Sequence, residues 1–254
     1  MPKLPETEIL DTGTTKYILF RTHDYVGRVL RTKGRYEPEL QAAASRLLEG
    51  IAPGVVLDVG ANIGTFAIPL AQKFPAHRFE CFEVQRVVHH QLCGNIVLNG
   101  LNNARAHDTG ISDAAAQIEV ALPDYGAERN IMGFSLDSEV RRHDYACVTV
   151  GETDVVSVAP LDSFAFNDVR LIKIDVEGLE LKVLHGAKDT LARNRFPPLI
   201  FEAWTQTPWY EQRRNELLSH VRSLGYEITE VGMNNIGQHA DHRAPVRFVV
   251  QGPP

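Results

Sequence analysis

Short apolar runs alternate along most of the chain with longer segments in which apolar residues recur every three or four positions. The short runs predict buried strands and the longer segments predict amphipathic helices. Strands are expected at residues 17–20, 26–30, 55–59, 79–83, 105–111, 171–175, 199–202 and 245–251. Helices are expected at residues 38–48, 65–74, 87–98 and 210–224, with a further helix after Gly178. This alternation predicts an α/β, Rossmann-like fold: a mostly parallel twisted sheet, helices on both faces and an antiparallel edge strand.

The segment from Val55 to Gly64 has the most informative pattern. A strand covered on both faces runs into a turn with Gly60 and Gly64, and a helix follows. Glycine permits backbone conformations that other residues avoid. We expect the turn to present bare N–H groups at a helix N-terminus, which suits a carboxylate or a phosphate.

The glycine spacing in this turn argues against a dinucleotide. A G-x-G-x-x-G fingerprint would need glycine where Asn62 and Thr65 stand, so a pyrophosphate would meet side chains. Asp58 instead places a carboxylate beside the turn, where it can hold an ammonium directly or through water. An amino-acid group carries both charges that such a site would bind: a carboxylate for the turn and an ammonium for Asp58.

A second carboxylate, Glu83, ends the next predicted strand. An acidic residue about 20 positions after the glycine turn holds a ribose diol in doubly wound folds. Glu83 alone would be read as a solvated strand end. An amino-acid site next to a ribose site, however, describes S-adenosylmethionine.

Acidic residues also follow later strands. Asp175 and Glu177 emerge after the strand at 171–175, Gly178 lets the chain turn into a helix, and Glu202 ends the strand at 199–202. The carboxyl ends of parallel strands share one edge of a sheet, so Asp58, Glu83 and Asp175 are expected to converge. A metal held by Asp175, Glu177 and Glu202 is conceivable, but the sequence does not define such a site and we predict none.

Two regions depart from the regular alternation. The first is residues 1–50, which are expected to form strands and a capping helix. The second is an insertion at about 123–154 within residues 51–254, which are expected to form the main domain. Glu37, just before the helix at 38–48, belongs either to a segment that closes over cofactor or to an ordinary loop. The insertion is interpreted as a binding lid rather than a disordered excursion, because residues 131–134 are too apolar to stay exposed.

Composition narrows the classes of function. The 254 residues are 44% hydrophobic, enough for a sizeable core, and the net charge of −6 opposes a nucleic-acid partner. The three cysteines form no C-x-x-C pair, and no run of about 18 apolar residues or signal-like N-terminus occurs. We therefore expect a cytoplasmic protein with no membrane partner and no metal; a homodimer remains open.

At this point the residues resemble a known family. Asp58 to Gly64, Glu83, Asn95 with Leu98 and Asn99, Lys173 to Gly178, and Glu202 after Pro198 are similar to motifs of the FkbM family of S-adenosylmethionine-dependent methyltransferases. The resemblance covers roughly residues 35–205 and implies the class I methyltransferase fold. The family usually has proline where this chain has Val84, which is expected to shift a loop without removing the Glu83 contact.

The resemblance implies methyl transfer to oxygen, typically a hydroxyl of a sugar, a polyketide or another small metabolite. The acceptor must be aligned behind an activated methyl group and its proton must be accepted. Asp175 is the first candidate for this role, Glu177 the second and His143, in the insertion, a third. Each has a structural alternative: helix capping for Asp175, a helix-dipole contact for Glu177 and simple solvation for His143.

The remaining cofactor contacts are assigned more loosely. Ser112 or Asp113 is expected at the adenine amino edge, unless they form an ordinary turn, and Asn62 is expected at the methionyl part, with Gly60 and Gly64 supplying the turn. Two other functions stay in competition. One is methylation of protein or nucleic acid, and the other is a non-catalytic cofactor-binding partner in a biosynthetic complex.

Overall fold

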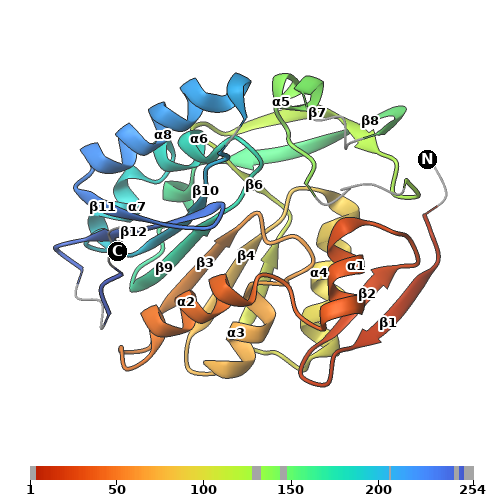
Figure 1. The fold of residues 1–254 in the computed structure, drawn as a ribbon, viewed down its shortest axis with the longest axis horizontal. Helices are drawn as coiled ribbons and strands as arrows, with labels where there is room; N and C mark the ends of the chain where they lie inside the picture. Colours follow the sequence, from red (N-terminus) through yellow and green to blue (C-terminus); the bar gives the residue numbers. More distant parts are fainter. Residues whose placement is uncertain (1–3, 128–132, 144–147, 206, 243–245, 249–254) are drawn as a thin grey trace, which may run out of the picture.

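Seven strands form the central sheet of the computed structural model, which describes residues 4–127, 133–143, 148–205, 207–242 and 246–248 (Figure 1). Their order is β11-β12-β10-β9-β3-β4-β5. The bounds are β3 Val55–Val59, β4 Arg78–Phe82, β5 Ala104–His107, β9 Val169–Ile174, β10 Leu199–Glu202, β11 Tyr226–Val231 and β12 Asn234–His239. Strands β10, β9, β3, β4 and β5 run parallel to one another, whereas β12 is antiparallel to both β10 and β11. The predicted α/β class with a mostly parallel sheet is confirmed.

The chain order reverses between β3 and β9, which are paired neighbours. From β3 the chain proceeds outward through β4 to β5, and from β9 it proceeds in the other direction to β10. A reversal of this kind opens a crevice beyond the carboxyl ends of the two central strands. This part of the sheet therefore positions the candidate site.

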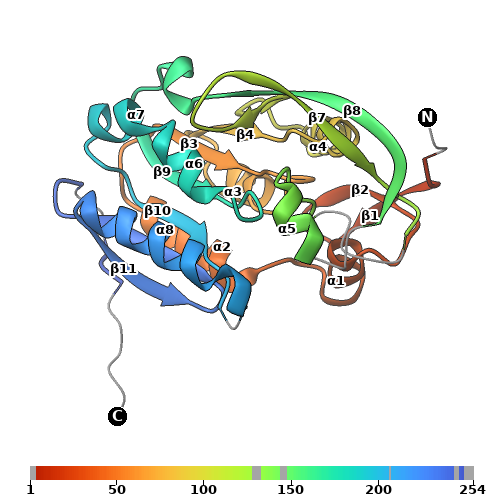
Figure 2. The ribbon, with the colours of Figure 1, turned by 90° about the horizontal axis from the view of Figure 1, so that it is seen from above.

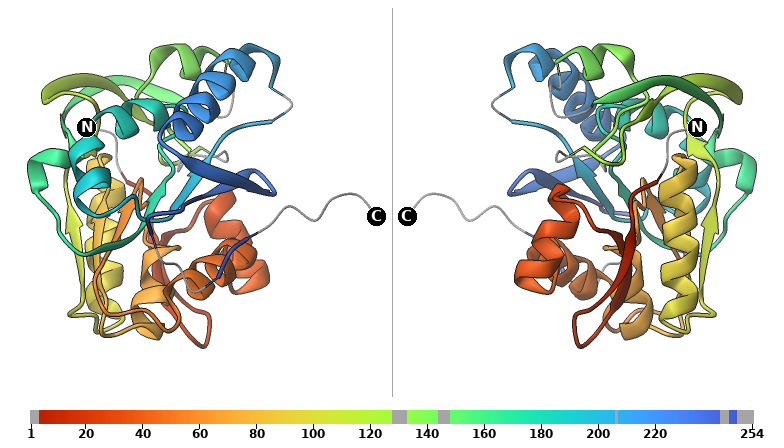
Figure 3. Two further views of the ribbon diagram at one scale, coloured as in Figure 1. Left: turned by 90° about the vertical axis from the view of Figure 1, so that its left-hand side faces the viewer. Right: turned by 90° about the vertical axis from the view of Figure 1, so that its right-hand side faces the viewer.

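Helices cover both faces of the sheet (Figure 3). On one face lie α2 Pro38–Leu48, α3 Ala67–Lys73 and α4 Arg86–Leu98, and on the other lie α6 Glu180–His185, α7 Lys188–Arg193 and α8 Glu211–Ser223. Successive strand residues point to opposite faces, so Val56 packs with the first group and Leu57 with the second. Both residues are fully buried, as expected for a central parallel strand.

The N-terminal part is a two-stranded antiparallel sheet, β1 Thr7–Asp11 and β2 Lys16–Phe20, followed by α1 Tyr25–Lys33. It packs against α4, where the Asn95 side chain accepts from Ile18 N–H at 2.6 Å and donates to Ile63 O at 2.9 Å. The predicted strand at 26–30 is wrong, because this segment is part of α1. Asp24 caps that helix by accepting from Gly27 N–H, and Gly34 ends it with φ +68°.

A third sheet, of three strands, carries the insertion (Figure 2). It contains β6 Gly110–Ile111, β7 Ala116–Pro123 and β8 Thr149–Ala159, in the order β6-β8-β7. The expected single strand at 105–111 is therefore divided between two sheets. The long β7–β8 ribbon leads to α5 Ser138–His143, which lies between α8 and the ribbon in both Figure 1 and Figure 2.

Two smaller expectations change at the level of single segments. The helix expected after Gly178 is divided into α6 and α7, and short 3-10 turns occur at η1 Leu161–Phe164 and η2 Pro208–Tyr210. Residues 246–248 are not in a strand, and the rest of the predicted strand at 245–251 lies outside the described residues; the antiparallel strand is β12 instead. Within the described residues, no helix combines the length and the apolar character needed to cross a membrane.

Candidate active site

A cavity lies beyond the carboxyl ends of β3, β4 and β9. It is lined by residues from these three strand ends, from β6 and from the insertion: Val59, Gly60, Asn62, Phe82, Glu83, Val84, Gln85, Gly110, Ile111, Phe134, Leu136, Asp175, Val176, Glu177 and Leu179. Five of the predicted site residues are therefore brought together here, namely Gly60, Asn62, Glu83, Asp175 and Glu177. The lining also includes apolar side chains, among them Val84, Ile111 and Phe134.

Close packing of the turn after β3 against the end of β9 explains the glycine at position 60. Gly60 has φ +81°, and a Cβ at this position would lie 1.7 Å from the backbone oxygen of Asp175. Real side-chain carbons do not approach backbone oxygens so closely. Glycine thus lets the turn and the loop carrying Asp175 meet at one end of the cavity.

The amides of this turn are engaged inside the protein, which corrects the expectation of bare N–H groups. Gly60 N–H and Ala61 N–H both donate to Phe82 O, at 3.0 and 2.9 Å, and Gly64 N–H donates to Ala61 O. Asn62 N–H donates to the Glu83 carboxylate. The turn therefore fastens β3 to the end of β4, because the hydrogen-bonding capacity of buried amides is met within the fold.

Glu83 is held rigidly at the cavity wall. Its Oε2 accepts from Asn62 N–H at 2.9 Å and its Oε1 accepts from Gln85 N–H at 2.8 Å. Burial raises the pKa of Glu83 to about 7, although these two amide donors act in the opposite direction. Each carboxylate oxygen has two lone pairs, so both oxygens can accept a further hydrogen bond from a ligand hydroxyl.

Asp58 lies behind the cavity and faces the ammonium group of Lys173. Lys173 Nζ is 3.4 Å from Asp58 Oδ1, 3.1 Å from Asp175 Oδ2 and 3.3 Å from Gly60 O. Burial raises the pKa of Asp58 to about 6, an effect that Lys173 partly opposes. Burial alone would lower the pKa of Lys173, but Asp175, Asp58 and Glu37 outweigh it and raise the pKa.

This arrangement bears on the predicted role of Asp58. Lys173 lies in a central strand with its side chain 5% exposed, whereas lysine side chains usually reach solvent. Asp58 does sit beside an ammonium, but the ammonium belongs to the protein. Asp58 is not among the residues that line the cavity, so its contact with a cofactor stays a prediction.

Three half-buried carboxylates meet near the end of β9. One oxygen each from Asp175, Glu177 and Glu202 can be chosen so that all three lie within 4.8 Å of one another. Burial raises the pKa of Glu202, and the charges of Asp175 and Glu180 raise it further, while Trp204 Nε1 donates to Glu202 Oε2 at 2.8 Å. Oxygen ligands in such a group suit a hard divalent cation, a grouping that the sequence did not define.

Glu180 was not predicted, although it organises the loop that carries Asp175 and Glu177. Its Oε1 accepts from Val176 N–H and Gly178 N–H, both at 3.1 Å, and Tyr210 donates to Oε2 at 3.3 Å. Glu180 is 2% exposed, and burial raises its pKa to about 7. The available signal was a glutamate two residues after Gly178, a position from which a carboxylate can reach back to loop amides.

The other predicted residues lie outside the cavity lining. Glu37 is half-buried, and its pKa is raised by burial and then by the charge of Asp175, so it lies near the acidic group. Ser112 donates to Asp113 at 3.1 Å in an exposed turn. His143 is exposed and stacks on Trp209 with ring centres 4.4 Å apart. Gly64, with φ +90°, packs against Ile68 and Leu92 rather than the cavity.

The insertion contributes Phe134 and Leu136 to the cavity wall. Phe134 is 6% exposed and packs with Val120 and Val156 of the β7–β8 ribbon. Phe134 is thus covered, and the role of the insertion as a lid stays a prediction. Residues 131 and 132, which the sequence included in it, lie outside the described residues.

Comparison with known proteins relates the chain to a family of methyltransferases. A family model described as the methyltransferase FkbM domain matches residues 58–228. Methyltransferase sdnD of Sordaria araneosa is 25% identical over 202 residues, covering 68% of this chain and 74% of the relative. Methyltransferase 1 of Beauveria bassiana is 25% identical over 145 residues; the match covers 53% of this chain and spans 58% of that relative.

Solved structures resemble the chain at the level of the fold. A Corynebacterium glutamicum protein aligns with a TM-score of 0.50 and 11% identity, over 85% of this chain and 89% of that chain. A methyltransferase FkbM from Methylobacillus flagellatus aligns with a TM-score of 0.49 and 18% identity, over 80% of this chain and 50% of that chain.

Proposed function

The chain belongs to the FkbM methyltransferase family, and from this premise we propose that it transfers a methyl group from S-adenosylmethionine to a hydroxyl of a small metabolite. The observation that carries the proposal is that one cavity is lined by all five of these residues: Gly60, Asn62, Glu83, Asp175 and Glu177. It lies at the strand-order reversal, where doubly wound folds bind nucleotide-like ligands. It also joins a carboxylate suited to a ribose with carboxylates suited to a cationic group.

The residues present fit the chemistry of S-adenosylmethionine. Glu83 would accept hydrogen bonds from the ribose diol, because its oxygens are already oriented by two amides. Val84, Ile111 and Phe134 would cover the adenine with apolar surface. The carboxylates after β9 would favour the positive charges of the ammonium and sulfonium groups.

The cofactor supplies a methyl group already activated on a sulfonium, so the protein's own task is alignment and proton removal. Asp175 is proposed to accept the proton of the acceptor hydroxyl at one carboxylate oxygen. Its Oδ2 lies 3.1 Å from Lys173 Nζ, which holds the side chain in place. Glu177 is the second candidate for this role, whereas His143 is directed to Trp209 and would serve only after a movement of α5.

Binding and turnover test this proposal separately. Calorimetry should show that S-adenosylmethionine binds and that NAD does not; equal binding of NAD would overturn the cofactor assignment. With a labelled methyl donor and a screen of hydroxylated metabolites, Asp175→Asn should lower turnover by roughly 100- to 10,000-fold, the usual range for a general base. Asp168→Asn at the opposite end of β9 is the matched control. Unchanged turnover in Asp175→Asn would remove the catalytic role of Asp175.

We propose that the reaction proceeds without a bound metal, because Asp175 already has a cationic partner in Lys173. Treatment with EDTA should then leave turnover within about twofold of the untreated enzyme. A loss that added Mg²⁺ restores would instead assign a cation to Asp175, Glu177 and Glu202.

A further inference from the structure

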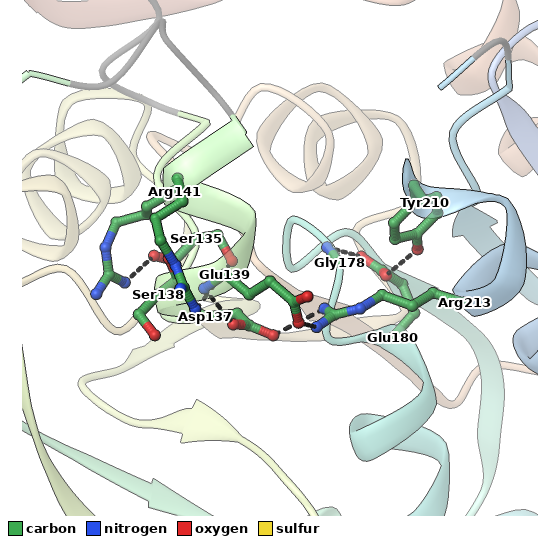
Figure 4. A network of polar contacts seen from close by, with 10 residues as sticks. Ser135, Asp137, Ser138, Glu139, Arg141, Gly178, Glu180, Tyr210 and Arg213 are labelled. Atoms are coloured by element: carbon green, nitrogen blue, oxygen red, sulfur yellow. Dashed lines mark hydrogen bonds and ion pairs between the residues drawn. The ribbon is translucent and has the colours of Figure 1, made fainter. Parts of the chain in front are cut away.

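The insertion is tied to α8 by a network of charged contacts (Figure 4). Arg213 on α8 donates from Nη1 to Asp137 Oδ2 at 2.8 Å and from Nη2 to the carboxylate of Glu139. Both acceptors lie at the start of α5. A guanidinium that donates to two carboxylates at once fixes the orientation as well as the distance of the two segments.

The segment that Arg213 holds is continuous with the cavity wall. Phe134 and Leu136 line the cavity, and Asp137 follows directly. Arg141 donates to Ser135 O at 2.6 Å, and its guanidinium lies 5.0 Å from the centre of the Phe134 ring. Because these bonds connect the segment from Phe134 to Arg141 internally, a displacement of α5 would carry the cavity wall with it.

The same end of α8 also supports the loop that carries Asp175 and Glu177. Tyr210 donates to Glu180, whose other oxygen holds the amides of Val176 and Gly178. From the insertion, Val140 packs on this loop so closely that a Cβ at Gly178 would lie 3.0 Å from its Cγ2. Figure 4 shows the two sets of contacts side by side.

From these contacts we propose that Arg213 is a positioning residue that holds the Phe134–Leu136 wall closed and thereby slows release of the bound nucleoside. This inference rests on the proposed function, since it assumes that S-adenosylmethionine and its demethylated product occupy the cavity. Arg213 does not line the cavity, so it acts through the insertion alone. Its loss should affect affinity and release much more than the chemical step.

Arg213→Gln tests the inference directly. Dissociation of S-adenosylhomocysteine, followed by stopped-flow fluorescence, should become about tenfold faster, and the KM for S-adenosylmethionine should rise by a similar factor. The kcat should stay within about threefold of the unaltered enzyme, or rise if product release limits turnover. Arg213→Lys, which keeps the charge without the two-pronged geometry, should give an intermediate release rate.

Arg214→Gln is the matched control, because Arg214 follows Arg213 on α8 but pairs with Glu230 of β11 at 2.9 Å. It should leave release unchanged. Asp137→Asn should accelerate release, and combining it with Arg213→Gln should add little, because both changes break the same contact. The difference between Arg213→Gln and the unaltered enzyme should shrink at high salt.

The failures of the two proposals are distinguishable. If the unaltered protein binds neither S-adenosylmethionine nor S-adenosylhomocysteine, the proposed function is overturned, and the role of Arg213 with it. If the unaltered protein binds them but Arg213→Gln releases the product no faster than Arg214→Gln, the role of Arg213 alone is overturned. Melting temperatures of all variants separate faster release from general unfolding; if Arg213→Gln does not fold, Asp137→Asn decides the question by the same release measurement.

Discussion

Lys173 compensates two carboxylates that have different surroundings. Asp58 is fully buried behind the cavity, whereas Asp175 is half-buried and faces it. One ammonium, 5% exposed, therefore links the interior of the sheet to a candidate catalytic group. A buried ion pair of this kind contributes modestly as a whole, but removing one member leaves an uncompensated charge.

Lys173→Met should therefore lower the free energy of unfolding by about 3–5 kcal/mol at neutral pH, measured by urea denaturation. In the variant the folded-state pKa of Asp58, already raised to about 6 from 3.8, rises further. The folded state then retains a proton that the unfolded state releases, so stability falls as the pH rises above about 4. The loss of unfolding free energy caused by Lys173→Met should thus be smaller at acidic pH.

Arg170→Met on the same strand is the control. It breaks a surface pair with Asp168 and should lower the free energy of unfolding by less than about 1 kcal/mol. Equal losses would contradict the role of Lys173.

Glu83 should make cofactor affinity depend on pH near neutrality. Burial places its pKa at about 7, and only the ionised form can accept from the ribose diol through both oxygens. Lowering the pH from about 8 to about 6 protonates the carboxylate, so affinity for S-adenosylmethionine should fall. The Glu83→Gln variant should bind S-adenosylmethionine roughly 10- to 100-fold more weakly at the higher pH. It should also lose this pH step, that is, the fall in affinity between the two pH values. Calorimetry measures both effects.

The control for that measurement is Glu80→Gln on the same strand. Glu80 pairs with Arg78 and His107 outside the cavity lining. Its substitution should leave both the affinity and the pH step intact. A pH step that persists in Glu83→Gln would show that another group titrates with binding.

At the scale of elements, the turn after β3 and the end of β9 have to approach as backbone against backbone. Gly60→Ala would place a Cβ 1.7 Å from Asp175 O, so one of the two elements must shift. Gly100→Ala is the control, because Gly100 also has positive φ, +65°, but has open space around it. The control should cost about 1–2 kcal/mol from backbone strain alone. Gly60→Ala should cost more and weaken S-adenosylmethionine binding at least about tenfold; equal effects in urea denaturation and calorimetry would contradict this account.

The elements that the sequence predicts best are those whose burial follows one simple period. The expected helix at 38–48 matches α2, and the expected strand at 55–59 matches β3. The segment at 26–30 has the same apolar content as a strand, and only the Asp24 cap and Gly34 distinguish it as part of a helix. The spacing of apolar residues does not show which strands pair with one another. For this reason the sequence predicts one strand at 105–111, whereas this segment contributes to β5 and β6 in two different sheets.

The candidate site shows a similar division. Strand-end carboxylates such as Glu83 and Asp175 could be predicted, because parallel strands bring their carboxyl ends to one edge. The partners of these groups could not. Lys173 and Glu180 act through contacts made across the sheet and across the α6–α8 layer, and sequence spacing does not specify such contacts.

At the scale of the whole molecule, acidic side chains gather near the end of β9, beside the cavity in which the proposed acceptor would bind. The chain has a net charge of −6, and the carboxyl groups of Glu37, Asp175 and Glu177 lie near the end of β9. Clefts lined by one sign of charge select ligands electrostatically before any close contact forms. A neutral or cationic hydroxylated metabolite fits this entrance better than a phosphorylated one.

Nucleic acid should therefore fail as a partner, which separates the proposed function from methylation of RNA or DNA. Binding through phosphates would need several lysine or arginine contacts and would weaken steeply with salt. In fluorescence anisotropy with labelled RNA at about 50 mM salt, we expect no saturable binding at micromolar protein. In a parallel assay with labelled methyl donor and a cell extract divided by size, the label should enter the small-molecule fraction rather than RNA or protein. Salt-sensitive RNA binding accompanied by label in the RNA fraction would contradict the electrostatic argument and reassign the acceptor, because a carboxylate-lined entrance would then have admitted a polyanion.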